Sequence, residues 1–209
     1  MKELIILIAW HKESNEDRVH AFQENKKSFA DHNPDVDIIT VMTPFEGMEA
    51  WLNTDLSCFK WYLENGHMHS AQRYLIVEWD CWCNCDMYAY YKRVWDCDIV
   101  VPGIKYPERD DWYWFSTIDK LPERVRKYTT GVVPFCGILL SNFAMKKVSQ
   151  EILKPEYYGL NSELRFGTVA TSLGLDPIVN PVCNRTISWS GISPLDSNYL
   201  GLHHPKKLT

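Results

Sequence analysis

Four short apolar runs in the first half of the chain restrict the fold more than any other feature of the sequence. They are rich in β-branched residues, mostly lack alternation, and cover residues 4–10, 36–41, 74–77 and 98–101. Strands of this kind are buried on both faces, which is typical of parallel sheets that helices cover on each side. At 209 residues the chain has the length of one good-sized domain. We therefore predict an α/β fold, with a mostly parallel central sheet and helices on both faces, as a single domain over residues 1–209.

Helix signals occupy the gaps between these runs, as crossovers between parallel strands require. Residues 14–30 predict a helix that Ser14 caps at its start. Two further helical segments are predicted, one over residues 56–64 and one in the crossover 86–94. Because such crossovers are right-handed, residues 1–101 should form a half-sheet of the kind that binds nucleotides.

The second half of the chain, residues 102–209, has a different texture. Residues 110–115 read Asp-Asp-Trp-Tyr-Trp-Phe and lie between prolines, which indicates a long functional loop. A later strand is predicted over residues 134–140. The sequence then predicts two helices: residues 142–153 with Ser141 as cap, and residues 163–173 with Ser162 as cap and Gly174 at the end.

Two carboxylates, Glu78 and Asp80, follow the third apolar run. If the strand continues through them, alternation places both on one face with Trp79 turned away, and their Cα atoms lie about 6–7 Å apart. Hard oxygen ligands at that spacing suit Mg²⁺ or Mn²⁺, and ligands bind at the carboxyl ends of strands in open α/β sheets. We interpret the pair as a metal and diphosphate site. The alternative is that both acids merely end a strand and are solvated.

Charge and composition exclude several classes of protein. The net charge is -5 and no basic run accompanies the aromatic segments, so nucleic acid is not an expected partner. No segment has the length of a membrane span, and the first apolar run is too short and too strand-like for a signal peptide. We expect a cytoplasmic protein, and leave open whether it works beside a membrane.

Seven cysteines in a chain without a secretory signal indicate reduced thiols. Three of them, Cys81, Cys83 and Cys85, crowd into five residues. Structural zinc sites usually pair Cys-x₂₋₄-Cys with a second pair elsewhere, and the sequence offers no such second pair. Ordinary buried thiols are therefore favoured, with a thiol-based metal site as the alternative.

The order of these features resembles the GT-A fold of nucleotide-sugar-dependent glycosyltransferases, a single Rossmann-like domain, over most of the chain. In that fold a strand ends in an Asp-x-Asp motif that holds a divalent cation against the donor diphosphate, and Glu78-Trp79-Asp80 is similar to it with Glu first. The resemblance implies Mn²⁺ or Mg²⁺ as cofactor and Asp80 as the more direct ligand. It leaves Glu78 to bind the cation directly or through water, or to reach the ribose.

The resemblance also assigns roles in the second half. Glu163 is similar in placement to the base that deprotonates the acceptor hydroxyl in an inverting transfer, although the helix dipole alone would favour a carboxylate there. The ending His203-His204-Pro205-Lys206 resembles a C-terminal segment that completes the metal shell. We expect His204 as a metal ligand and Lys206 near the diphosphate, against the alternative of an ordinary polar terminus.

Several other residues are expected at the two substrates. Those expected to bind the donor are Trp10, His11, Asp55 and Gly137, and those expected to form a platform for the acceptor sugar are Trp112 and Trp114. For Trp10 a place in the core, and for Asp55 a helix-capping role, are the alternatives.

The function implied is a metal-dependent, hexosyltransferase-type enzyme, inverting if Glu163 is the base, that moves a sugar from a UDP- or GDP-sugar to a hydroxyl of a glycan. Residues 1–101 would bind the nucleotide sugar and residues 102–209 the acceptor, in glycan or surface polysaccharide synthesis. One alternative is a noncatalytic carbohydrate- or nucleotide-binding module of the same fold. Another is a sugar nucleotidyltransferase, which usually needs a Gly-rich loop that residues 9–13 lack.

Overall fold

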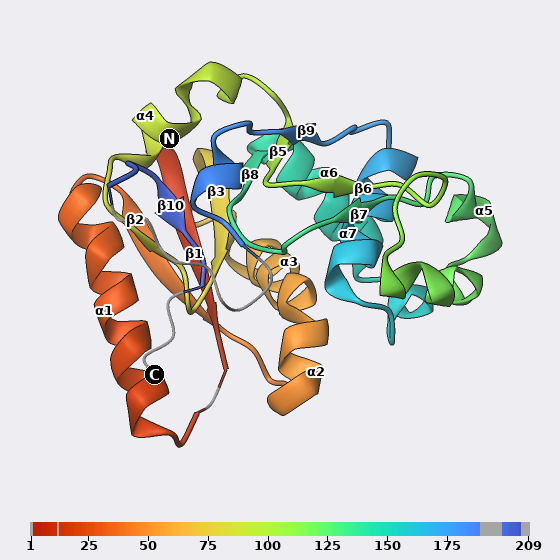
Figure 1. Ribbon diagram of the computed structural model, residues 1–209, viewed down its shortest axis with the longest axis horizontal. Coiled ribbons are helices and arrows are strands. Elements are labelled where there is room, and N and C mark those ends of the chain that lie inside the picture. Colours follow the sequence, from red (N-terminus) through yellow and green to blue (C-terminus); the bar gives the residue numbers. More distant parts are fainter. Residues whose placement is uncertain (1, 12, 189–197, 206–209) are drawn as a thin grey trace.

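A six-stranded sheet with the order β2-β1-β3-β8-β5-β9 forms the centre of the computed structural model, which describes residues 2–11, 13–188 and 198–205 (Figure 1). β8 is antiparallel to its neighbours β3 and β5, and the other pairings are parallel, so the predicted mostly parallel sheet is confirmed. The strands of this sheet are β1 (Lys2–Trp10), β2 (Asp37–Met42), β3 (Ala71–Glu78), β5 (Ile99–Val101), β8 (Ile138–Ser141) and β9 (Ile178–Val179).

The two faces of the sheet are buried by different sets of helices. Along β1, residues such as Ile6 and Ile8 pack in one apolar cluster, while Ile5 and Leu7 pack in the other. Figure 1 shows α1 and α4 on the first side and α3, α6 and α7 on the second. The helices are α1 (Glu16–His32), α2 (Gly47–Leu52), α3 (Thr54–Asn65), α4 (Met87–Tyr91), α5 (Glu123–Arg126), α6 (Asn142–Ile152) and α7 (Ser162–Ser172), and the 3₁₀ turns are Lys92–Val94, Tyr113–Lys120, Pro155–Tyr157 and Cys183–Arg185.

Two of the three predicted helix caps were placed one residue away from the real ones. Asn15, not Ser14, caps α1, and its side chain accepts a hydrogen bond from the Arg18 N–H at 3.1 Å. Asn161, not Ser162, caps α7. Asparagine is as good a cap as serine, so the sequence offered two neighbouring candidates in each case. The cap of α6, by contrast, is Ser141 as predicted.

Three predictions of local structure were wrong in whole or in part. The strand over residues 36–41 was predicted to be buried on both faces, but β2 is mostly half-buried, because it lies at an edge of the sheet and pairs with β1 alone among the described strands. The aromatic segment that begins at residue 112 is not a loop throughout, since Tyr113–Lys120 forms a 3₁₀ helix. The strand predicted over residues 134–140 begins at Ile138.

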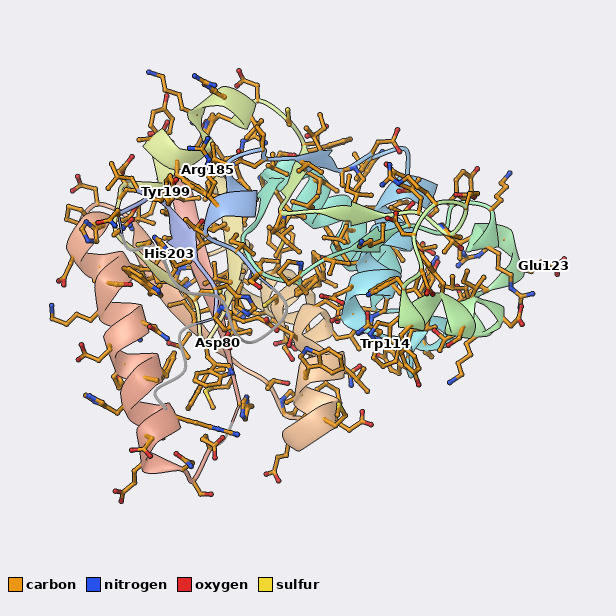
Figure 2. The ribbon with its side chains drawn as sticks, viewed as in Figure 1. Asp80, Trp114, Glu123, Arg185, Tyr199 and His203 are labelled. Carbon is orange, nitrogen blue, oxygen red and sulfur yellow. The ribbon has the colours of Figure 1, made fainter. Side chains whose placement is uncertain are left out.

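Two small sheets join segments of the second half of the chain to each other or to the first half. β6 (Ile104–Lys105) pairs with β7 (Gly131–Val132), and β10 (Leu202–His203) pairs with β4 (Trp82–Cys83), both antiparallel. The β10–β4 pair brings residues 202–205 beside the end of β3, and the His203 ring stacks on Trp82 with centroids 4.2 Å apart. Figure 2 shows Arg185 and Tyr199 side by side in the same region, with a guanidinium-to-ring distance of 5.3 Å.

Gly137 lies where β8 meets this C-terminal segment. Its φ is +66°, and an added Cβ would lie 2.7 Å from the Leu202 Cδ2 atom. We expect Gly137→Ala to lower the free energy of unfolding by roughly 2–4 kcal/mol, since a left-handed backbone and an overpacked core each contribute. Urea denaturation measures this. Gly174 is the matched control because its φ is +71° but no atom lies within 4 Å of an added Cβ. Equal losses in both variants would show that the contact with Leu202 contributes nothing.

None of the helices in the described ranges combines the length and the apolar composition that crossing a bilayer requires.

Candidate functional site

Glu78 and Asp80 lie at the carboxyl end of β3, near the middle of the sheet. The strand ends at Glu78, and a turn follows in which the Cys81 N–H donates to the Glu78 carbonyl at 3.0 Å. The buried side chain of Asn25, from α1, donates to the Trp79 carbonyl at 3.1 Å and fixes this turn. Asp80 therefore reaches the site from a turn and not from a continued strand, which corrects the expected alternation.

His204 joins the two carboxylates from the far end of the chain. Its Nε2 atom lies 3.4 Å from Asp80 Oδ1 and 3.5 Å from Glu78 Oε2. Its Nδ1 atom lies 2.6 Å from the Ser188 carbonyl oxygen. Because a carbonyl can only accept, Nδ1 carries a hydrogen, and this bond points Nε2 at the carboxylates. The three side chains that the sequence proposed as metal ligands are thus brought together.

The charges of this group fit a divalent cation. Burial by itself would lower the pKa of His204, but hydrogen bonds to Asp80 and Glu78 outweigh it and hold that pKa well above its ordinary value. The two carboxylates therefore favour a positive charge beside them, and the ligand atoms of the three groups all lie within 4.8 Å of one another. Carboxylate oxygens suit Mg²⁺ and Mn²⁺, and Nε2 of a neutral imidazole adds one nitrogen ligand. A divalent cation bound between Glu78, Asp80 and His204 can supply that positive charge.

These ligands open onto a cavity of about 860 Å³, which we call the main cavity. Its wall combines these three candidate metal ligands with a third carboxylate and a group of aromatic rings. The lining residues include Glu78, Asp80, His204, Glu163, Trp112 and Trp114. Both Asp80 and Trp114 line this cavity, and Figure 2 shows Asp80 where β1 and β3 end and Trp114 farther to the right, beyond α2.

Glu163 lies in the first turn of α7 and is 8 % exposed. Its Oε1 atom accepts a hydrogen bond from the Phe135 N–H at 3.1 Å, which orients the carboxyl group. Burial, with a smaller contribution from the charge of Glu78, raises the pKa of Glu163 to about 8. A carboxyl group of this pKa can exchange a proton near neutral pH.

Aromatic rings form a further part of the wall of the main cavity. Trp112 is buried, and Trp114 is half-buried with its ring centroid 5.7 Å from that of Trp51. Trp51 and Tyr113 also line the cavity and are exposed. Sequence reasoning missed Trp51, because nothing in the short helix α2 indicates that it faces Trp114.

Trp10 and His11 stand at the end of β1. The Trp10 ring packs face to face on Phe22, with centroids 4.3 Å apart, and is 8 % exposed. Both residues line a smaller cavity of about 70 Å³ beside the main one, together with Trp79. Trp79 was expected to turn away from the site, but it lines both cavities.

Asp55 does not line either of these cavities. Its carboxylate is fully buried and accepts two hydrogen bonds from Arg165, of which the one from Nε measures 2.7 Å. The structure gives Asp55 a partner in the core and not a place beside Glu78, Asp80 and His204. Arg165 forms its ion pair with Asp55 and not with Glu163, and it does not line the main cavity.

Gly137, which was also predicted to bind the donor, does not line the main cavity. Gly137 lies under Leu202, and its carbonyl accepts a hydrogen bond from the Tyr91 hydroxyl at 2.8 Å. It thus allows a close approach of the C-terminal segment. Lys206 lies outside the described residues.

The crowded cysteines do not gather around one point. The Cys83 thiol donates to the Ser28 carbonyl at 3.5 Å, whereas Cys81 lies near Cys136 and His204. Within the described part of the chain, Cys81, Cys83 and Cys85 form no common ligand set.

Comparisons with known proteins complete the description. No family model matches the sequence, and no curated protein matches it. Solved structures with a similar course of the chain include mouse xyloside xylosyltransferase 1 in its apo form, with 11 % identity, a TM-score of 0.47 and coverage of 90 % of this chain and 88 % of that one. The glycosyltransferase GlyE of Streptococcus pneumoniae has 9 % identity, a TM-score of 0.45 and coverage of 85 % and 45 %. The galactosyltransferase LgtC, in complex with donor and acceptor sugar analogs, has 12 % identity, a TM-score of 0.44 and coverage of 88 % and 74 %. At these scores the likenesses assign neither a family nor an activity to this chain.

Proposed function

We propose that this chain is a metal-dependent glycosyltransferase that moves a sugar from a nucleoside-diphosphate donor to an acceptor hydroxyl. The observation that carries the proposal is the convergence of Glu78, Asp80 and His204 on one point in the wall of a cavity that also holds Glu163. Such a transfer requires three things in the same cavity: oxygen ligands for a hard cation, a carboxyl group with a raised pKa, and aromatic rings for the sugar.

The donor side follows from the metal ligands. Glu78, Asp80 and His204 would hold Mn²⁺ or Mg²⁺, and a bound cation would offset the charge of the leaving diphosphate. The Ser188 carbonyl keeps the imidazole of His204 in the tautomer that can bind it. We place the base and ribose of a UDP- or GDP-sugar toward the end of β1, where the ring of Trp79 and the side chain of His11 line the cavity wall.

The acceptor side follows from the aromatic rings. Trp112 and Trp114 line the main cavity together with Trp51, which also lines the smaller cavity at the end of β1. Aromatic faces bury the apolar faces of sugars, while the hydroxyl groups remain free to hydrogen-bond. An acceptor glycan lying on these rings would point a hydroxyl toward the metal ligands and Glu163.

Glu163 is the proposed base for an inverting transfer. The Phe135 N–H fixes one of its oxygens, and its raised pKa suits the removal of a proton from a hydroxyl group. Since the base must be ionised, the transfer rate should rise with pH. The midpoint of that rise should lie below about 8, because a bound cation offsets the charge of Glu78 that helps to raise the pKa of Glu163.

We expect Glu163→Gln to retain donor binding and to lower the transfer rate by roughly 100- to 10,000-fold, the range that a positioned base contributes. The amide keeps the size of the side chain but cannot accept the proton. Transfer assays over a range of pH, combined with nucleotide binding measured by calorimetry, separate the two effects. A variant that transfers at the normal rate would remove Glu163 from this role.

The proposal as a whole is tested by thermal unfolding in the presence of nucleoside diphosphates and nucleotide sugars, with Mn²⁺ and with a chelator. At a ligand concentration about 100 times Kd, binding should raise the melting temperature by roughly 5–10 °C for a chain of this size. We expect one nucleotide to act, and to act only with the cation. Two outcomes would contradict the proposal and favour a noncatalytic binding module. One is that nucleotides stabilise the protein equally with Mn²⁺ and with the chelator, and the other is that no nucleotide stabilises it.

A further inference from the structure

Two buried thiols lie directly beside the carboxylate site. Cys81 follows the turn after β3, and Cys136 precedes β8. Both residues are completely buried. Their sulfur atoms and a ring nitrogen of His204 all lie within 4.8 Å of one another. His204 therefore belongs to two different groups of potential metal ligands.

The two groups differ in chemical character. Glu78 and Asp80 offer oxygen atoms, which prefer hard cations such as Mg²⁺ and Mn²⁺. Cys81 and Cys136 offer sulfur atoms, and two sulfurs with one imidazole suit Zn²⁺ and its heavier analogue Cd²⁺. Three protein ligands with one remaining position are sufficient for a tetrahedral zinc ion.

We propose that Cys81, Cys136 and His204 form a second cation site, selective for thiophilic metals, that excludes the hard cation by taking His204 from it. Binding forms two sulfur–metal bonds and one nitrogen–metal bond, and the two thiol protons leave to solvent. The existence of this site is independent of the proposed function, and only its inhibitory effect depends on that function. Zn²⁺ would thus inhibit the metal-dependent reaction, because it would bind His204, the ligand that both cations need.

Cadmium is the probe, because cadmium–thiolate bonds absorb in the ultraviolet and report sulfur ligation without any assay of activity. The intact protein is titrated with Cd²⁺ in the presence of a phosphine reductant. Cys136→Ala and Cys81→Ala should each weaken binding by at least about 10- to 100-fold, the loss that even an outer-shell change causes. The matched control is Cys58→Ala, which removes another completely buried thiol from the core, on α3. It should retain the wild-type affinity.

Three further measurements separate this proposal from the proposed function. Asp80→Asn should retain the cadmium–thiolate band, whereas His204→Ala should weaken Cd²⁺ and Mn²⁺ binding together. Added Mn²⁺ should raise the apparent Kd for Cd²⁺ in the wild type. A band that is equally strong in Cys136→Ala, Cys81→Ala and Cys58→Ala would overturn the site. Simultaneous binding of both metals without competition would overturn the sharing of His204.

Discussion

Replacing Asp80 by Asn should abolish cation-dependent nucleotide binding and sugar transfer while the fold remains intact. The substitution keeps the size of a side chain that is 4 % exposed, but it removes one of the two negative charges that face His204 Nε2. Loss of an outer-shell partner of a metal already costs about 10- to 100-fold in affinity, so loss of a charged ligand should cost more. The measurements are Mn²⁺-dependent thermal stabilisation by nucleotides and a direct transfer assay.

Asp111→Asn is the matched control for this variant. Asp111 lines the same cavity beside the aromatic rings, but it is exposed and does not belong to the cation ligand group. The same change of charge and shape should therefore leave cation-dependent nucleotide binding as it is. If both variants lost it equally, the general negative charge of the cavity, and not ligation by Asp80, would explain the effect.

Replacing Asp55 by Ala should destabilise the protein by about 3–5 kcal/mol, the usual cost of breaking a buried ion pair. Arg165 is completely buried, and besides Asp55 its guanidinium donates to the carbonyl groups of Leu52, Tyr157 and Leu160. Without Asp55 a buried positive charge has no counter-charge. Since domains have total stabilities of about 5–15 kcal/mol, the loss should appear as a large fall in the urea midpoint.

The double variant Asp55→Leu, Arg165→Met distinguishes ion pairing from simple loss of packing. It removes both charges and keeps most of the volume, so it should recover much of the stability that Asp55→Ala loses. The exposed pair of Lys27 and Asp31 on α1 is the control, and Asp31→Ala should give no measurable change. A double variant as unstable as the single one would show that the carbonyl contacts of Arg165 carry the stabilisation instead.

The sheet could be predicted because burial on both faces leaves a strong signal in the sequence. β1 and β3 are continuous apolar runs, and their alternate residues fill two separate cores. The pairing of β4 with β10 left no such signal. Each of these strands has two residues, and a partner more than a hundred positions away cannot be recognised from two side chains.

The candidate site, like the sheet, could be predicted only in part. Glu78 and Asp80 could be identified because they follow a buried strand, and His204 because of the family resemblance. The Ser188 carbonyl and Cys136 could not be, since their relation to His204 depends on where loops return. The role of Asp55 could not be predicted for the same reason. The role of a carboxylate depends on which distant side chain contacts it, and Asp55 contacts Arg165.

The position of His204 at the far end of the chain has a mechanical consequence. A cation held by Asp80 and His204 joins the end of β3 to the C-terminal segment, and so closes a loop that contains most of the second half of the chain. The conformational entropy that such a clip removes from the unfolded chain grows with the length of the loop. The ion would therefore act as a removable cross-link, and chelation would lower the resistance of the entire domain to unfolding rather than loosen one pocket.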